Sequence, residues 1–234
     1  MKTYDTAFDE LLDRAVILSK SLTRQLEDIQ HAENMDPEDI YQLSLSAAYS
    51  GEKMALRLRT LPCWTGKESA KDDVNAIIKA AVPVEIGYTK ENWFILRLPL
   101  LLPKKEQCKR DYINGIVYPV FSDFCMKMDQ IRYGKCVIVF RHVYDHKRQK
   151  RHYRDHDNIE INQIVDVMAL WLMVDDAPMR CCHFYCSAVA EKERTEVYLV
   201  PIEDFPKWLE QEPNIPDKGV DIFPKPILNP QKDR

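Results

Sequence analysis

The first sixty residues of the chain carry apolar side chains at helical spacing in two successive stretches. Residues 5–30 and about 37–59 each form one apolar stripe with a period near 3.6 residues, which predicts two helices. Between them, Asp36 is a natural N-cap and Pro37 suits the first helical turn. We therefore expect residues 1–60 to form an antiparallel helical hairpin. Two helices cannot bury both stripes alone, so we expect the hairpin to pack on the rest of the chain or on another copy.

From about residue 82 the pattern changes to short strands that alternate with helices. Strands are predicted where β-branched and aromatic residues gather, and helices where apolar residues recur every three to four positions. The predicted strands are residues 93–98, 136–143, 179–189 and 196–200, and the predicted helices are 111–129, 158–174 and 203–211. We expect the last two strands to pair as a hairpin. This order predicts an α+β fold over residues 82–212, with a mixed β-sheet and packed helices.

Two segments flank this predicted domain. Residues 61–81 contain Pro62 and Gly66 and then a possible short helix, which indicates a linker. Residues 213–234 are rich in proline and hold few large apolar side chains, so we expect an extended or disordered tail.

The composition is that of a globular chain that stays outside membranes. Of the 234 residues 45% are hydrophobic, and no apolar run is long enough to span a bilayer. The N-terminus has no apolar stretch of the kind found in signal peptides, so we expect a cytoplasmic protein whose seven cysteines are reduced. A net charge of −4 does not by itself indicate nucleic-acid binding, although basic residues can still cluster on one face.

Four aspartates are the strongest candidates for chemistry. Asp155 and Asp157 are two residues apart, which in an extended segment places both carboxylates on one side. A predicted helix follows and leads to Asp175 and Asp176. If that helix packs back on its strand, the two pairs could meet and bind a hard divalent cation such as Mg²⁺. The alternative is that the first pair caps the helix and the second forms a turn.

A basic segment immediately precedes the first aspartate pair. Its members are Arg141, Lys147, Arg148, Lys150, Arg151 and Arg154, and they stand against a single acid, Asp145. Tyrosines and histidines are interspersed, so the segment could follow a phosphate backbone and stack on bases. The alternative is a solvated loop between two elements.

Two weaker signals have structural explanations. Cys181, Cys182, His183 and Cys186 could suggest zinc, but the segment alternates like a strand, which favours buried free thiols. His156 lies between the two aspartates, yet strand alternation would point it away from them, which favours a structural role.

The acidic pattern resembles that of RusA-type Holliday junction resolvases. The run Asp155-His156-Asp157-Asn158, a helix containing Asp166, and then Val174-Asp175-Asp176-Ala177 is similar to that family's acidic signature. Upstream, Phe94-Ile95-Leu96-Arg97-Leu98-Pro99 resembles the family's opening strand. The resemblance covers about residues 92–202 and leaves out the predicted hairpin and the tail.

The resemblance implies a Mg²⁺-dependent (or Mn²⁺-dependent) endonuclease that acts on branched DNA as a homodimer. It assigns Asp155, Asp157 and Asp176 as catalytic metal-binding acids, with Asp175 beside them. One position departs from the family, which has a lysine where this chain has Ile161. The alternative is therefore a non-catalytic DNA-binding or protein-binding chain on the same fold, with a degenerate acidic site. A third reading is an adaptor whose aspartates only cap and turn.

Overall fold

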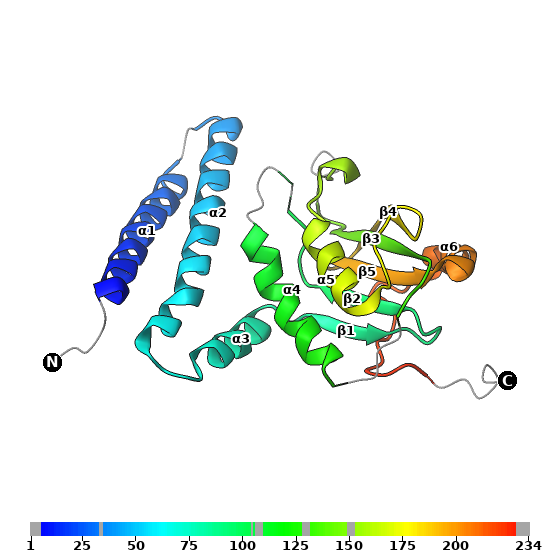
Figure 1. Cartoon of the computed structure of the whole chain (residues 1–234). Helices are drawn as coiled ribbons and strands as arrows, with labels where there is room; N and C mark the ends of the chain where they lie inside the picture. The colour runs from blue at the N-terminus through cyan, green and yellow to red at the C-terminus, as the bar shows by residue number, and fades with distance from the viewer. Residues whose placement is uncertain are drawn as a thin grey trace. The chain divides into compact units, whose positions relative to one another are not determined.

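The computed structural model describes residues 6–32, 35–103, 105, 110–127, 132–148 and 153–227. In this part of the chain there are six α-helices and one mixed five-stranded sheet, which confirms the predicted α+β class (Figure 1). The chain divides into two compact units, Met1–Ile78 and Lys79–Arg234.

The first unit is built on two long helices, α1 (Thr6–Gln30) and α2 (Pro37–Thr60). The carboxylate of Asp36 caps α2 by accepting a hydrogen bond from the backbone N–H of Glu38 at 3.0 Å. The two helices contact each other, and Gln25 donates to the hydroxyl of Ser46 at 2.9 Å. Their buried residues are small, Ala15 on α1 and Ala47 on α2. Helix α3 (Ala70–Ala81) follows.

The second unit contains the sheet, whose strand order is β1-β2-β5-β3-β4. The strands are β1 (Glu85–Tyr88), β2 (Phe94–Leu98), β3 (Cys136–Asp145), β4 (Cys181–Ala190) and β5 (Arg194–Pro201). Only β3 and β4 are parallel among these neighbours, because α5 connects them.

Helices cover both faces of the sheet (Figure 1). On one face α4 (Arg110–Cys125) and α5 (Asn162–Leu172) pack on a core that includes Phe94, Phe121 and Phe140. On the other face Trp208 of α6 (Phe205–Gln211) packs against Val139 and Tyr198. Because both faces are covered, the residues of the central strands are buried almost without interruption.

The predicted hairpin of residues 179–200 is wrong. Strands β4 and β5 do not pair with each other, because β3 lies between them and pairs with both. The physical reason is the apolar character of β3, which is buried over nearly its whole length. A strand of this kind needs a neighbour on each side, and a place at the edge would leave one of its ladders unpaired. The short strand β1 was not predicted.

The C-terminal segment, which was expected to be extended or disordered, passes through the short 3₁₀ helix η6 (Glu212–Asn214) and a turn at residues 217–218 before it reaches β1. Tyr88 of β1 and Phe223 exchange two backbone hydrogen bonds of 2.8 Å. Gly87 permits this approach, because a Cβ there would collide with the carbonyl oxygen of Phe223. Within the described residues, the helices lack the length and apolar character needed to cross a membrane.

Candidate functional site

The basic segment leaves the sheet where β3 ends, and its two ends are held together. The rings of Tyr144 and Tyr153 stack at a centroid distance of 4.3 Å and an angle of 11°. The backbone N–H of Arg154 donates to the hydroxyl of Tyr144 at 3.0 Å. We call residues 145–154 the β3 loop. These contacts hold together the two described ends of the loop, at Tyr144 and at Tyr153–Arg154.

The basic residues of the β3 loop lie in different environments. Lys147 is exposed. The guanidinium of Arg148 lies 5.8 Å from the ring centroid of Tyr144 and pairs with Glu193. Arg154 is half-buried and donates to the carbonyl oxygen of Leu102. Burial, and then the charge of Arg148, lower the pKa of Arg154. Lys150 and Arg151 lie outside the described residues.

Arg141 belongs to the interior and not to this surface. It is 5% exposed, and its guanidinium pairs with Glu196 at 3.1 Å and with Glu212 at 2.8 Å. Glu196 is fully buried and also pairs with Arg194 at 2.6 Å. Burial alone would raise the pKa of the Glu196 carboxyl, but Arg141 and Arg194 hold it below its usual value. Arg141 is therefore not available to DNA, contrary to the expectation from its place in the sequence.

Two histidines lie near the base of the loop. The ring of His142 is fully buried and stacks on His156 at a centroid distance of 6.1 Å. Among the described residues, neither ring nitrogen of His142 has a hydrogen-bond partner. Burial, and then His156, lower the pKa of His142 to about 4, so the ring is neutral at pH 7. His156 also lies against Tyr185 and makes a 2.9 Å hydrogen bond with Ser187, contacts that hold it on the sheet.

The structure does not bring the two aspartate pairs together. Asp155 and Asp157 are exposed at the end of the β3 loop, beside Tyr144. Asp175 and Asp176 are exposed near the beginning of β3. They are placed there because the backbone N–H of the preceding residue, Val174, donates to the carbonyl oxygen of Tyr133. Helix α5 alone separates the pairs by about 16 Å of helix length. Along β3, Cys136 and Tyr144 are about 26 Å apart.

This separation does not fit the cation site that the resemblance implies. Carboxylates that share one Mg²⁺ need oxygens within roughly 3–5 Å of each other. Within the described residues, no group of three or more His, Cys, Asp or Glu side chains could hold a metal ion. A Mg²⁺ or Mn²⁺ site that uses both pairs remains a prediction from the resemblance, without support from this geometry.

The position that departs from the resolvase pattern lies in the core. Ile161 is 5% exposed and packs among the apolar residues beneath α5. A lysine there would bury an ammonium group at high cost unless the chain moved. Position 161 therefore serves packing in this structure.

The cysteine side chains of β4 do not all lie on one face of the sheet. Cys181 and Cys186 stand at alternating positions of β4 and so point to opposite faces of the sheet. Cys181 lies opposite Cys136 in the β3–β4 register, and both are buried. The hydrogen bond between the two thiols lowers the pKa of Cys181 and raises that of Cys136.

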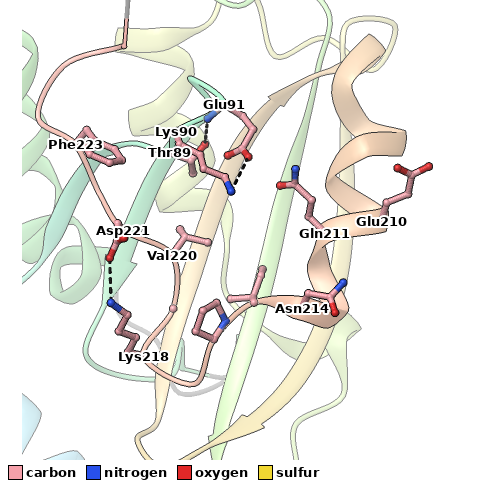
Figure 2. A pocket seen from close by; sticks show the side chains of 13 residues that line it. Thr89, Lys90, Glu91, Glu210, Gln211, Asn214, Lys218, Val220, Asp221 and Phe223 are labelled. Atoms are coloured by element: carbon pink, nitrogen blue, oxygen red, sulfur yellow. Dashed lines mark hydrogen bonds and ion pairs between the residues drawn. The ribbon is translucent and has the colours of Figure 1, made fainter.

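A pocket of about 340 Å³ lies elsewhere on the second unit, between the turn at Thr89, the end of α6 and the C-terminal segment (Figure 2). Two of its ion pairs join neighbouring side chains, Lys218 with Asp221 at 3.2 Å and Lys90 with Glu91 at 3.7 Å. Because the lining holds more acidic than basic side chains, the pocket does not favour an anion such as phosphate.

These features define an α+β protein with a mixed sheet and a clasped basic loop at the end of strand β3. The chain belongs to a family of unknown function, DUF6100, whose family model matches residues 3–223. The match therefore takes in both units and is not confined to the sheet. Neither a curated protein nor a solved structure matches the chain.

Proposed function

We propose that this chain binds nucleic acid through the β3 loop. The observation that carries the proposal is the clasp formed by Tyr144 and Tyr153, which stack at 4.3 Å and close the base of the loop. A closed base reduces the conformational entropy that the loop would lose on binding. A basic loop without such a clasp would be better explained as a solvated connection.

The charge of the loop suits a phosphate backbone. Between residues 145 and 154 there are five basic side chains and one acidic side chain. Contacts of Lys and Arg with phosphates release counterions, and this release supplies most of the affinity of non-specific binding. The overall charge of −4 does not oppose this, because charges more than about 10 Å away are largely screened at physiological salt.

The resemblance to RusA-type resolvases, over about residues 92–202, favours a RusA-like fold and branched DNA as the form of nucleic acid. We also propose that α1 and α2 form the antiparallel hairpin that their apolar stripes predict. Nuclease activity remains a prediction, and the separated aspartate pairs make the binding function the better-supported one.

The binding experiment compares two charge reversals of equal size. In one variant Lys147, Arg148, Lys150 and Arg151 become Glu. In the control variant the exposed Lys20, Lys71, Lys90 and Lys225 become Glu. Anisotropy of a labelled four-way junction, and of a linear duplex, gives the affinities. We expect the loop variant to lose at least about 100-fold in affinity, and the control to lose much less. Equal losses, or no binding by the unaltered chain, would refute the proposal.

Cutting is tested in the same samples. The junction is incubated with the unaltered chain, and with Asp157→Asn, in the presence of Mg²⁺ or Mn²⁺. If the proposed function is correct, both proteins bind the junction and neither cuts it. Cutting that Asp157→Asn abolishes would establish the nuclease reading, and would show that the acidic pairs meet in another arrangement.

A further inference from the structure

The two edge strands of the sheet differ in length and in how their outer sides are paired. At one edge, β1 is only four residues long, and Phe223 of the same chain pairs with Tyr88. At the other edge, β4 is ten residues long and pairs only with β3 among the described strands. Within the described part of the second unit, the short edge is therefore partly covered, and no strand lies beside the long edge.

The long edge also lacks the usual protection against strand pairing. Edges of monomeric sheets are commonly blocked by charged side chains, prolines or bulges. The segment Cys181–Ala190 contains no charged residue, no proline and no glycine. Its register with β3 is continuous, so it has no bulge. Val189 is 50% exposed, and His183 and Ser187 are exposed as well.

The backbone groups that face the free edge can be identified. The carbonyl of Arg180 accepts from Cys136 at 2.9 Å, and the carbonyl of Ala190 accepts from His146 at 3.0 Å. Successive residues of a strand direct their backbone groups to opposite sides. Even-numbered residues of β4 therefore face β3. The residues whose N–H and C=O groups face outward are Cys181, His183, Tyr185, Ser187 and Val189, and of these the N–H of Cys181 already donates to the carbonyl of Ala177 at 3.0 Å.

We propose that this edge pairs antiparallel with β4 of a second copy, which makes one continuous sheet across a twofold axis at Tyr185. A twofold axis perpendicular to the sheet requires one residue to lie opposite itself. Only Tyr185 and Cys186 are central enough to keep nearly all of β4 paired. With Cys186 on the axis, Arg180 would lie opposite Lys192 of the second copy, and the like charges would repel. With Tyr185 on the axis, Arg180 lies opposite Ala190.

The register at Tyr185 is also chemically self-consistent. The outward N–H and C=O groups of Tyr185 form two hydrogen bonds with the same groups of Tyr185 in the second copy. His183 lies opposite Ser187 of the second copy, whose hydroxyl is bonded to His156 of its own chain and has capacity for a further hydrogen bond. No charged residue of β4 faces another, because the strand has none. The central part of the edge, from His183 to Ser187, is therefore complementary to the same segment of a second copy.

The test compares the 234-residue chain with variants that carry a charged side chain at position 185, on the proposed twofold axis. Sedimentation equilibrium from about 1 to 100 µM should show the unaltered 27.5 kDa chain associating to a dimer. Tyr185→Lys and Tyr185→Glu should each be monomeric, because each places like charges opposite one another. An equimolar mixture of the two should recover the dimer. Tyr185→Phe is the matched control and should remain dimeric.

Tyr185 also stacks on Phe140, so circular dichroism must show that the charged variants fold. If they do not, His183→Pro replaces them, because its N–H faces outward and proline there leaves the β3 ladder intact. That variant should be monomeric and folded. A monomeric unaltered chain at every concentration would overturn the proposal. So would a dimer that persists in the folded charged variants or in His183→Pro, since pairing would then lie elsewhere, for example in the helices of the first unit.

Discussion

Arg141 of β3 and Lys147 of the loop that follows it are close in sequence and opposite in environment. Arg141 is buried in the sheet, where Glu196 and Glu212 neutralise it. Lys147, six residues further on, is exposed. Buried charges need partners, whereas exposed charges are solvated and free to meet a ligand. A basic run in a sequence can therefore contain both structural and binding residues.

The largest expected effect on stability comes from disrupting the buried ion pairs of Glu196 with Arg141 and Arg194. Glu196→Gln removes the carboxylate that Arg141 and Arg194 share, and leaves two buried guanidinium groups short of a counter-charge. We expect the free energy of unfolding to fall by about 3–5 kcal/mol, measured by urea denaturation. Glu193→Gln, which removes the partner of Arg148 on the loop, should cost less than about 1 kcal/mol. Similar losses for both would contradict the distinction between the two groups.

A second effect concerns pH and the buried His142. Its pKa is lowered from 6.5 to about 4 in the folded chain, so the unfolded chain binds its proton first as the pH falls. This contribution to stability is complete above about pH 6.5 and is lost progressively as the pH falls towards 4. The loss amounts to about 3 kcal/mol.

Urea denaturation at a series of pH values measures it. His142→Leu should weaken the decline of stability between pH 6.5 and 4 relative to the unaltered chain. His146→Gln changes an exposed histidine outside the sheet and should leave the decline unchanged. An identical decline in His142→Leu would contradict a lowered pKa of His142 in the folded chain.

A smaller effect tests the clasp of the loop. Tyr153→Ala removes the stacking partner of Tyr144, which is worth about 1 kcal/mol. We expect trypsin to cleave the chain several-fold faster between Lys147 and Arg154, because the loop opens more often. Tyr118→Ala, at an exposed position of α4, is the control. Unchanged cleavage would mean that the stack does not restrain the loop.

Local sequence patterns predicted most helices and the central strands, since apolar periodicity is a local property. Helices α1 and α2 and strands β2 and β3 lie within a few residues of their predicted bounds. The pairing of strands was harder to predict. The order that inserts β3 between β4 and β5 depends on long-range burial, which no short window of sequence contains.

The candidate site shows the same limit. The basic segment was recognised from its composition, but Glu196, the partner that removes Arg141 from the surface, lies 55 residues away. The two aspartate pairs have a spacing compatible with one site only if α5 returns the chain to its starting point. In the structure α5 carries the chain to the other end of β3, because a parallel β3–β4 pair requires a connection of that direction.

The central claim, that the β3 loop binds a nucleic-acid backbone, is tested most directly by the salt dependence of affinity. The logarithm of the association constant for a duplex should fall linearly with the logarithm of salt concentration, with a slope of about −4 if the loop's basic residues each neutralise a phosphate. The variant with Lys147, Arg148, Lys150 and Arg151 changed to Glu should have a slope near zero. An affinity of the unaltered chain that does not change between about 50 and 200 mM salt, or an unchanged slope in the variant, would contradict the account.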